Sequence, residues 1–148
     1  MNWLAQCPRH QDNCVIAPSG RGGPPAGLHH CRDRRDRFAA VQRLQQRFGR
    51  CGAAQGAGTL IHDGKGMALC NEGKSGMASG GMGDLLSGII AALGPYVGWS
   101  AAEAARLGAV IHGEAADLAA ADAESGACWH QTCCPLIGRL VNPDTITS

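Results

Sequence analysis

The stretch from Asn71 to Gly88 constrains the fold of this chain more than any other. It reads NEGKSGMASGGMGDLLSG, with five glycines among residues 73–83 and an acid, Asp84, directly after them. An apolar run with helical spacing follows, made of Leu85, Leu86, Ile89, Ile90 and Leu93. The pattern therefore predicts a glycine loop that leads into the N-terminus of a helix, with Asp84 in the first turn.

A loop of this kind suits the binding of a phosphate group. Unpaired backbone N–H groups and the positive end of the helix dipole meet at a helix N-terminus. Glycines let the backbone approach an anion and adopt positive φ. A carboxylate beside the anion can accept the proton of a substrate hydroxyl during phosphoryl transfer. The alternative is a glycine-rich turn in which Asp84 only caps the helix.

Longer motifs give this loop a family resemblance. The residues from Gly76 to Gly88, GMASGGMGDLLSG, closely resemble the signature of the NAD(P)H-hydrate dehydratases, a branch of the ribokinase-like superfamily. The similarity continues from Ser100 to Asp117, and residues 56–59 resemble the end of the family's nucleotide-contacting K-G-x-G-T stretch. The resemblance implies an α/β fold, namely the C-terminal half of a three-layer α/β/α sandwich with an irregular N-terminal segment.

The same resemblance implies an activity. Dehydratases of this family repair NADH and NADPH that have been hydrated on the nicotinamide ring. The ring hydroxyl is phosphorylated from ADP or ATP, with Mg²⁺ offsetting the phosphate charge, and then leaves as phosphate. The implied partner is the small-molecule substrate NAD(P)H hydrate.

The motif positions imply the site residues. Asp84 would be the catalytic base. The nucleotide and its phosphates would be bound by Gly56, Ala57, Gly58, Thr59, Asn71, Gly80, Gly81, Met82 and Gly83. Gln55 replaces the lysine that the family has at this position, and Lys74 and Ser75 replace its Asn-Pro or Asn-Ala pair. No metal-ligating side chains are expected, and His112 is expected to be packed or exposed rather than catalytic.

Length and composition narrow the remaining choices. The 148 residues form at most one domain and carry a net charge of +1, which indicates no nucleic-acid or membrane partner. The N-terminus lacks a signal-peptide pattern, so a cytoplasmic location is expected. By resemblance, the first half of the family domain would precede Met1. We therefore expect residues 1–148 to be a single partial domain with open apolar faces, impaired activity, and poor solubility or dependence on a partner, a homo-oligomer being one such arrangement.

Periodicity predicts further elements in the first half of the chain. A buried strand is expected at residues 14–16, followed by an irregular loop at 17–35, which is rich in Gly, Pro and Arg. The ribokinase-like portion is expected to span residues 36–143. It begins with a helix whose apolar stripe consists of Phe38, Val41, Leu44, Gln45 and Phe48. Residues 50–55 are ambiguous, and 59–62 and 67–70 are expected to form a hairpin.

Two more helices are expected in the second half. One runs from about Ser100 to Ala121 and begins with a capping box of Ser100 and Glu103. Its expected apolar face consists of Ala104, Leu107, Ala109, Val110, Ile111, Ala115 and Leu118. The other is a short apolar helix from Pro135 to Val141, which follows an irregular segment at 127–134.

Three segments, 17–36, 50–56 and 127–134, depart from the family pattern and carry surplus Cys, His and Arg residues. Each can be spelled in codons that restore the pattern when read in a shifted frame. The second then ends a buried strand in the expected lysine, and the third becomes an ordinary helix entry. The hypothesis is that the chain is a frameshifted version of a dehydratase, which the coding DNA would test. Without a signal peptide, the eight cysteines are not expected to form a disulfide framework.

Two other functions remain open on this sequence. A small-molecule kinase of the same superfamily would use the same glycine–aspartate loop, and would release phosphorylated product without elimination. A Cys/His metal-binding module would use His29, His30 and Cys31 or the segment 128–134. Neither cluster has the paired spacing that is usual in structural zinc sites, and stoichiometric metal in the purified protein would identify such a module.

Overall fold

The structure, a computed structural model, describes residues 14–17, 36–48, 51–56, 58–73, 77, 79–122 and 130–142. The elements are, in chain order, β1 (Cys14–Ala17), α2 (Arg37–Phe48), β2 (Cys51–Ala54), β3 (Thr59–His62), β4 (Met67–Cys70), α3 (Met82–Val97), α4 (Ala101–Asp122) and α5 (His130–Val141). No helix in this described part is both long and apolar enough to cross a membrane.

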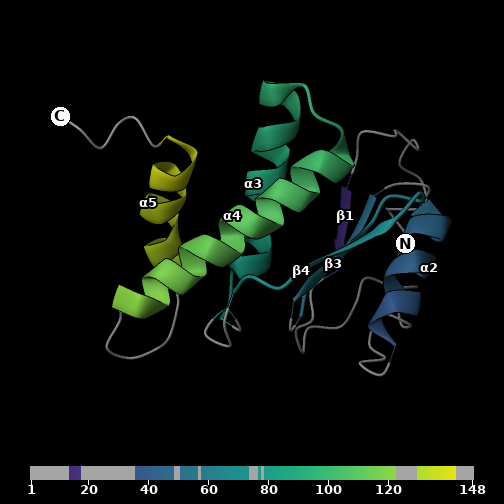
Figure 1. Ribbon diagram of the computed structural model, residues 1–148, viewed down its shortest axis with the longest axis horizontal. Coiled ribbons are helices and arrows are strands. Elements are labelled where there is room, and N and C mark those ends of the chain that lie inside the picture. The colour runs from purple at the N-terminus through teal and green to yellow at the C-terminus, as the bar shows by residue number, and fades with distance from the viewer. Residues whose placement is uncertain are drawn as a thin grey trace.

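The four strands form one sheet in the order β1-β2-β3-β4 (Figure 1). β1 and β2 are parallel, whereas β2–β3 and β3–β4 are antiparallel. The predicted hairpin is therefore confirmed. Its turn is held by the Asp63 carboxylate, which accepts the N–H groups of Lys65 and Gly66 at 2.8 and 2.7 Å. Gly64 supplies the positive φ of 89° in the same turn.

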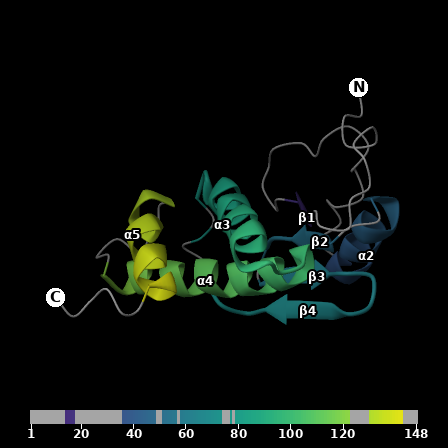
Figure 2. The same ribbon diagram turned by 90° about the horizontal axis from the view of Figure 1, so that it is seen from above.

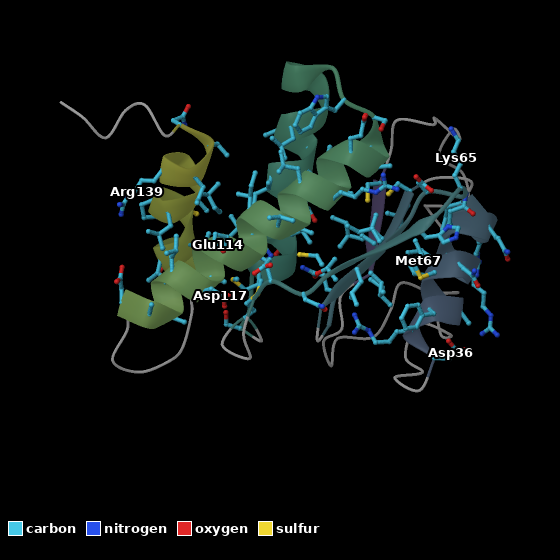
Figure 3. All side chains as sticks on the ribbon, in the orientation of Figure 1. Asp36, Lys65, Met67, Glu114, Asp117 and Arg139 are labelled. Carbon is cyan, nitrogen blue, oxygen red and sulfur yellow. The ribbon has the colours of Figure 1, made fainter. Side chains whose placement is uncertain are left out.

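Alternation along the strands divides the core into two layers. Leu60 and Ala54 pack with Val41 of α2, and Met67 completes this side (Figure 3). On the other face Ile61 packs with Leu86 of α3 and with α4. Figure 1 shows α2 on one side of the sheet and α3 and α4 on the other. The described part is thus a three-layer α/β/α arrangement, and the predicted fold class is confirmed.

Small residues allow β2 to lie at the centre of this arrangement. A Cβ atom on Gly52 would stand 3.3 Å from Leu44 Cδ2 and 3.3 Å from the Val41 carbonyl oxygen, both on α2. All four residues of β2 are buried. The ambiguous segment 50–55 therefore contains a central strand, which strand propensity alone would not favour because its residues are Cys, Gly and Ala.

Several predicted apolar faces are wrong in detail. Phe38 is 56% exposed, although it was expected in the buried stripe of α2. On α4, Val110 is 44% exposed and Leu118 is 39% exposed. The expected burial of Ala104, Ala109, Ile111 and Ala115 is confirmed. The same helix also buries Gly108, where α3 approaches so closely that a Cβ would stand 2.9 Å from Ile90 Cγ1.

The C-terminal helix is longer than expected. α5 begins at His130 rather than Pro135, and Cys133 is completely buried against a cluster of small residues on α4. Figure 2 shows α5 packed at the end of α4 that is remote from the sheet. At the other terminus, Ala17 is the last residue of β1 rather than the first of a loop. The rest of the expected loop lies outside the described residues, and the domain bounds remain predictions.

Candidate functional site

The glycine loop enters α3 as the sequence predicts. Gly81 is the N-cap residue, with a left-handed φ of 87°, and no side chain caps the helix among the described residues. The helical hydrogen-bond ladder begins with the Leu85 N–H donating to the Gly81 carbonyl at 2.9 Å. The N–H groups of Met82, Gly83 and Asp84 therefore lie outside the ladder, at the positive end of the helix dipole.

Asp84 occupies the first turn of α3 and its side chain is exposed. It is not the N-cap residue, because Gly81 holds that position. The alternative in which Asp84 only caps the helix is thus not supported. Its carboxylate stands in the same turn as backbone N–H groups that suit an anion.

The end of β2 meets the start of α3. A Cβ atom on Gly83 would stand 3.0 Å from Gln55 Oε1, so the Gln55 side chain lies against this turn. Gln55 directly follows the last residue of β2, at the carboxyl end of the parallel pair. Ligands in open α/β sheets bind outside the carboxyl ends of the strands. The residue that replaces the family's lysine therefore faces the expected phosphate position.

A second group of expected nucleotide-binding residues assembles at the start of β3. Thr59 pairs with Cys70 across the hairpin. A Cβ atom on Gly58 would stand 3.3 Å from Asn71 Oδ1, and Gly58 itself has a φ of 74°. The structure thus brings Gly58, Thr59 and Asn71 together, while Gly80, Gly81, Met82, Gly83 and Asp84 form the helix entry. Ala57, Lys74 and Ser75 lie outside the described residues.

Arg37 lies at the turn between β2 and β3, a position that no sequence pattern predicts. Its guanidinium group donates to the carbonyl oxygens of Ala54, at 3.3 Å, and Gly58. A Cβ atom on Gly56 would stand 2.8 Å from this guanidinium group. Arg37 therefore fixes the turn that carries the expected nucleotide-binding glycines and brings a positive charge to it. The only local signal is its position after the N-cap Asp36, which accepts the Ala39 N–H at 2.9 Å.

His130 was also missed. It is the first residue of α5, and its Nδ1 atom lies 3.3 Å from the Gly80 carbonyl oxygen. A Cβ atom on Gly81 would stand 2.8 Å from the same nitrogen. The ring therefore lies directly against the glycine loop. No sequence pattern links two residues fifty positions apart, and the segment around His130 was assigned to a frameshift.

His112 of α4 packs against the start of α3, next to the glycine loop. It is 2% exposed and hydrogen-bonded to the Met82 backbone, while its Nε2 atom has no partner within the described part of the chain. Desolvation lowers its pKa to about 4, against the ordinary 6.5. Of the two non-catalytic placements expected for His112, packed or exposed, the structure shows the packed one.

α4 also holds the segment that follows β4. The Asp117 carboxylate accepts the Gly73 N–H at 3.1 Å, and Figure 3 shows Asp117 on α4 above this segment. A Cβ atom on Gly113 would stand 2.5 Å from Glu72 Cβ and 2.7 Å from the Glu72 carbonyl carbon. α4 is thus in close contact with residues 72 and 73, and this contact fixes the position of the preceding Asn71 beside Gly58.

The described part of the chain contains no cluster of metal-ligating side chains. No group of three or more His, Cys, Asp or Glu residues there could hold a metal ion. His29, His30, Cys31 and Cys128 lie outside this part. The described geometry therefore offers a phosphate-binding helix entry with one carboxylate, and it offers no protein cage for a metal.

Comparison with known proteins agrees with the motif. The family model described as NAD(P)H-hydrate dehydratase matches residues 4–134. The bifunctional NAD(P)H-hydrate repair enzyme Nnr of Vibrio cholerae is 55% identical over 83 residues, which is 56% of this chain and 17% of that enzyme. The Nnr enzymes of Coxiella burnetii and Escherichia coli are each 37% identical over 97% of this chain, and these matches cover 30% and 28% of their own lengths. The chain thus spans less than a third of these relatives.

Solved structures show the same fold. The protein SMU.573 of Streptococcus mutans superposes with a TM-score of 0.64 at 25% identity, covering 72% of this chain and 38% of that one. Bacillus subtilis YxkO superposes with a TM-score of 0.63 at 23% identity, covering 88% of this chain and 48% of that one. The α/β arrangement is therefore shared with known structures.

Proposed function

Since this chain belongs to the NAD(P)H-hydrate dehydratase family, we propose that it binds an adenine nucleotide at the α3 entry and dehydrates hydrated NADH or NADPH there. The observation that carries the proposal is the helix entry itself. Gly81 ends the loop with positive φ, three backbone N–H groups follow outside the helical ladder, and Asp84 stands among them. The family match supplies the substrate class, because the Nnr relatives are NAD(P)H-hydrate repair enzymes.

The residues present fit a nucleotide phosphate. A side chain at position 81 or 83 would meet His130 or Gln55, so glycine keeps the backbone open to a bound anion. The N–H groups of Met82, Gly83 and Asp84 would hold the terminal phosphoryl group. Gly58, Thr59 and Asn71 would contact the nucleoside part of the nucleotide. Mg²⁺ would be held mainly by the nucleotide phosphates and water and would offset the phosphate charge, which leaves the Asp84 carboxylate for proton transfer.

Asp84 has a defined task in this proposal. The nucleotide supplies the phosphoryl group that turns the ring hydroxyl into a leaving group. Asp84 accepts the proton of that hydroxyl, and the amides of the first turn stabilise negative charge as it develops on the phosphoryl oxygens. The dipole of α3 acts in the same direction. ADP and ATP would both fit this role, and the assay below distinguishes them.

Substitution of Asp84 tests the proposal. The protein is incubated with NADH hydrate, Mg²⁺ and either ADP or ATP, and regenerated NADH is followed by its absorbance. Removing a general base typically costs about 10²- to 10⁴-fold in rate, so Asp84→Asn should lower kcat by at least about 100-fold. Nucleotide affinity, measured by calorimetry, should change little because the backbone amides remain.

A matched control removes another exposed carboxylate. Asp122 is the last residue of α4, and Asp122→Asn should retain the wild-type rate. Turnover that survives Asp84→Asn would contradict the assigned base. Phosphorylated substrate that accumulates without elimination would instead identify a kinase.

A further inference from the structure

Two thiols lie side by side at the start of the parallel strand pair. Cys14 begins β1, Cys51 begins β2, and the register pairs them directly. Directly paired residues lie on the same face of a sheet, with strands about 4.8 Å apart. The Cys14 thiol donates a hydrogen bond to the Cys51 sulfur, and both cysteines are free. Cys14 also packs against the buried cluster that contains Cys51.

The backbone geometry is suited to a covalent bond between them. Disulfides join residues whose Cα atoms are about 4.4 to 6.8 Å apart, and the strand spacing falls within that range. The two residues are also far apart in the sequence, which makes their contact a product of the sheet. A bond also requires the two Cβ atoms to approach to about 3.5 to 4.5 Å, so the starts of the two strands must draw slightly closer than the usual spacing while they stay in register.

The two thiols differ in exposure and in acidity. Cys14 is half-buried on β1, which is an edge strand of the described sheet, whereas Cys51 is 5% exposed. The hydrogen bond to Cys51, together with burial, raises the pKa of Cys14. The same hydrogen bond lowers the pKa of Cys51; the Arg106 guanidinium also lowers it, against burial and the nearby Asp63 carboxylate. Arg106 and Asp63 are ion-paired at 2.7 Å. One thiol is thus reachable and its neighbour is the better thiolate.

We propose that Cys14 and Cys51 form a dithiol redox site, which a small-molecule disulfide such as oxidised glutathione converts into a Cys14–Cys51 disulfide. Starting with Cys51 as the thiolate, Cys14 passes its proton to the Cys51 sulfur, attacks one sulfur of the external disulfide, forms a mixed disulfide and releases one thiolate. The released thiolate takes that proton from Cys51, and the Cys51 thiolate then attacks Cys14 Sγ and displaces the second thiolate. The protein loses two hydrogens, the oxidant gains them, and an excess of reduced thiol reverses the exchange.

This site is separate from the proposed nucleotide site. Cys14 and Cys51 lie at the amino ends of β1 and β2, whereas Gln55 lies just beyond the carboxyl end of β2. Four-residue strands separate these two edges by about 10 Å. Oxidation of the pair therefore needs neither nucleotide nor substrate, and its test does not depend on turnover.

The test is a mapping of disulfides in the native chain. The reduced protein is treated with oxidised glutathione, remaining thiols are blocked with N-ethylmaleimide, and the digest is analysed by mass spectrometry. We expect a Cys14–Cys51 linked peptide, on the order of tenfold more abundant than any other cysteine pair, because the sheet register holds these two residues side by side. Dithiothreitol should abolish it. Alkylation of both cysteines after oxidation, or linkage among the eight cysteines without preference, would overturn the proposal.

Single substitutions distinguish the attack by Cys14 from the later displacement by Cys51. In Cys51→Ser, oxidation of Cys14 should stop at the mixed disulfide with glutathione, because no neighbouring thiolate displaces the glutathione. Cys70→Ser removes another buried thiol from the same core and should leave the Cys14–Cys51 link unchanged. Circular dichroism checks that each variant is folded. The wild-type map decides the proposal by itself if Cys51→Ser does not fold.

Discussion

At the level of single residues, the His130 ring orients one peptide of the glycine loop. Its Nδ1 atom lies 3.3 Å from the Gly80 carbonyl oxygen. A peptide group is planar and trans, so its N–H points away from its carbonyl oxygen. When Nδ1 carries the proton and donates to Gly80, the Gly81 N–H is directed to the opposite side. His130 thereby favours one orientation of a backbone donor in the proposed phosphate site.

Substitution of His130 should therefore change nucleotide affinity. One hydrogen bond contributes about 0.5 to 1.5 kcal/mol, so His130→Ala should weaken ADP binding by roughly 2- to 12-fold in calorimetry. His130→Asn can place an amide N–H near the Nδ1 position and should recover most of the affinity. His130→Gln carries its amide one bond farther and should not. Equal affinities for all three variants would show that the contact does not position the loop.

His112 makes stability depend on pH. Desolvation lowers its pKa to about 4 in the folded chain, against 6.5 in the ordinary state, so the unfolded chain binds its proton first. The stabilisation is fully present above pH 6.5 and is lost as the pH falls toward 4. The shift corresponds to about 3 kcal/mol. We expect the free energy of unfolding of the wild type, relative to His112→Gln, to fall by about that amount between pH 7 and pH 4 in urea titrations.

Other groups set the background of this measurement. Hydrogen bonds lower the pKa values of Asp63 and Glu103, so these carboxylates also lose stabilising interactions in acid. Their effect is common to wild type and variant, and the difference between the two curves isolates His112. A difference that stays constant from pH 7 to pH 4 would contradict the burial of a neutral imidazole.

At the level of elements, Gly81 at the N-cap of α3 and Gly88 within α3 have opposite requirements. Gly81 has a φ of 87° and a Cβ there would stand 2.8 Å from His130 Nδ1, whereas a Cβ on Gly88 would meet nothing within 4 Å. Gly81→Ala should therefore destabilise the protein by about 1 to 3 kcal/mol. Gly88→Ala should stabilise it by about 0.5 to 1 kcal/mol, since alanine is the better helix former.

The opposite signs make this pair a sharp test of the helix entry. Both changes add one methyl group to the same helix, and thermal unfolding reports each. Only Gly81→Ala should also weaken ADP binding, because it alone alters the turn with the free N–H groups. Similar stability changes for the two variants would mean that Gly81 does not hold a left-handed N-cap.

On the scale of the whole molecule, α4 connects the sheet to α5. Its 22 residues extend about 33 Å, with Ala104, Ala105 and Ala109 in the cluster below the sheet and Ala115, Ala116 and Ala119 in the cluster with α5. Between these clusters, Gly113 and Asp117 hold the segment after β4. One helix thus determines how the glycine loop, Asn71 and α5 lie relative to one another.

Gly113→Ala should disturb this arrangement. Its Cβ would stand 2.5 to 2.8 Å from Glu72 Cβ and backbone atoms, so the segment must move away from α4. Overpacking of this kind costs about 1 to 3 kcal/mol, measured by chemical denaturation. ADP affinity should fall as well, because Asn71 moves with the segment. Gly138→Ala on α5 is the control, because a Cβ there meets nothing within 4 Å. Its free energy of unfolding should be unchanged or higher, and its ADP affinity should be unchanged.

Much of the fold could be predicted because local patterns specify local hydrogen bonds. The hairpin follows from Asp63 and Gly64, and the start of α4 follows from the Ser100–Glu103 capping box, which forms with the Ser100 N–H donating to the Glu103 carboxylate at 2.9 Å. The buried and exposed faces were less predictable. Phe38 and Val110 fit an apolar periodicity but are exposed, and periodicity contains no information on how closely neighbouring elements approach.

The sequence alone thus determined the glycine loop, its helix and the first-turn position of Asp84, since each depends on residues within a few positions of one another. Only the tertiary structure brought Gln55 to Gly83, His130 to Gly80 and Cys14 to Cys51. These contacts join distant parts of the chain. They arise when strands pair and helices pack simultaneously, because the position of each contact depends on the volume of every side chain between the elements.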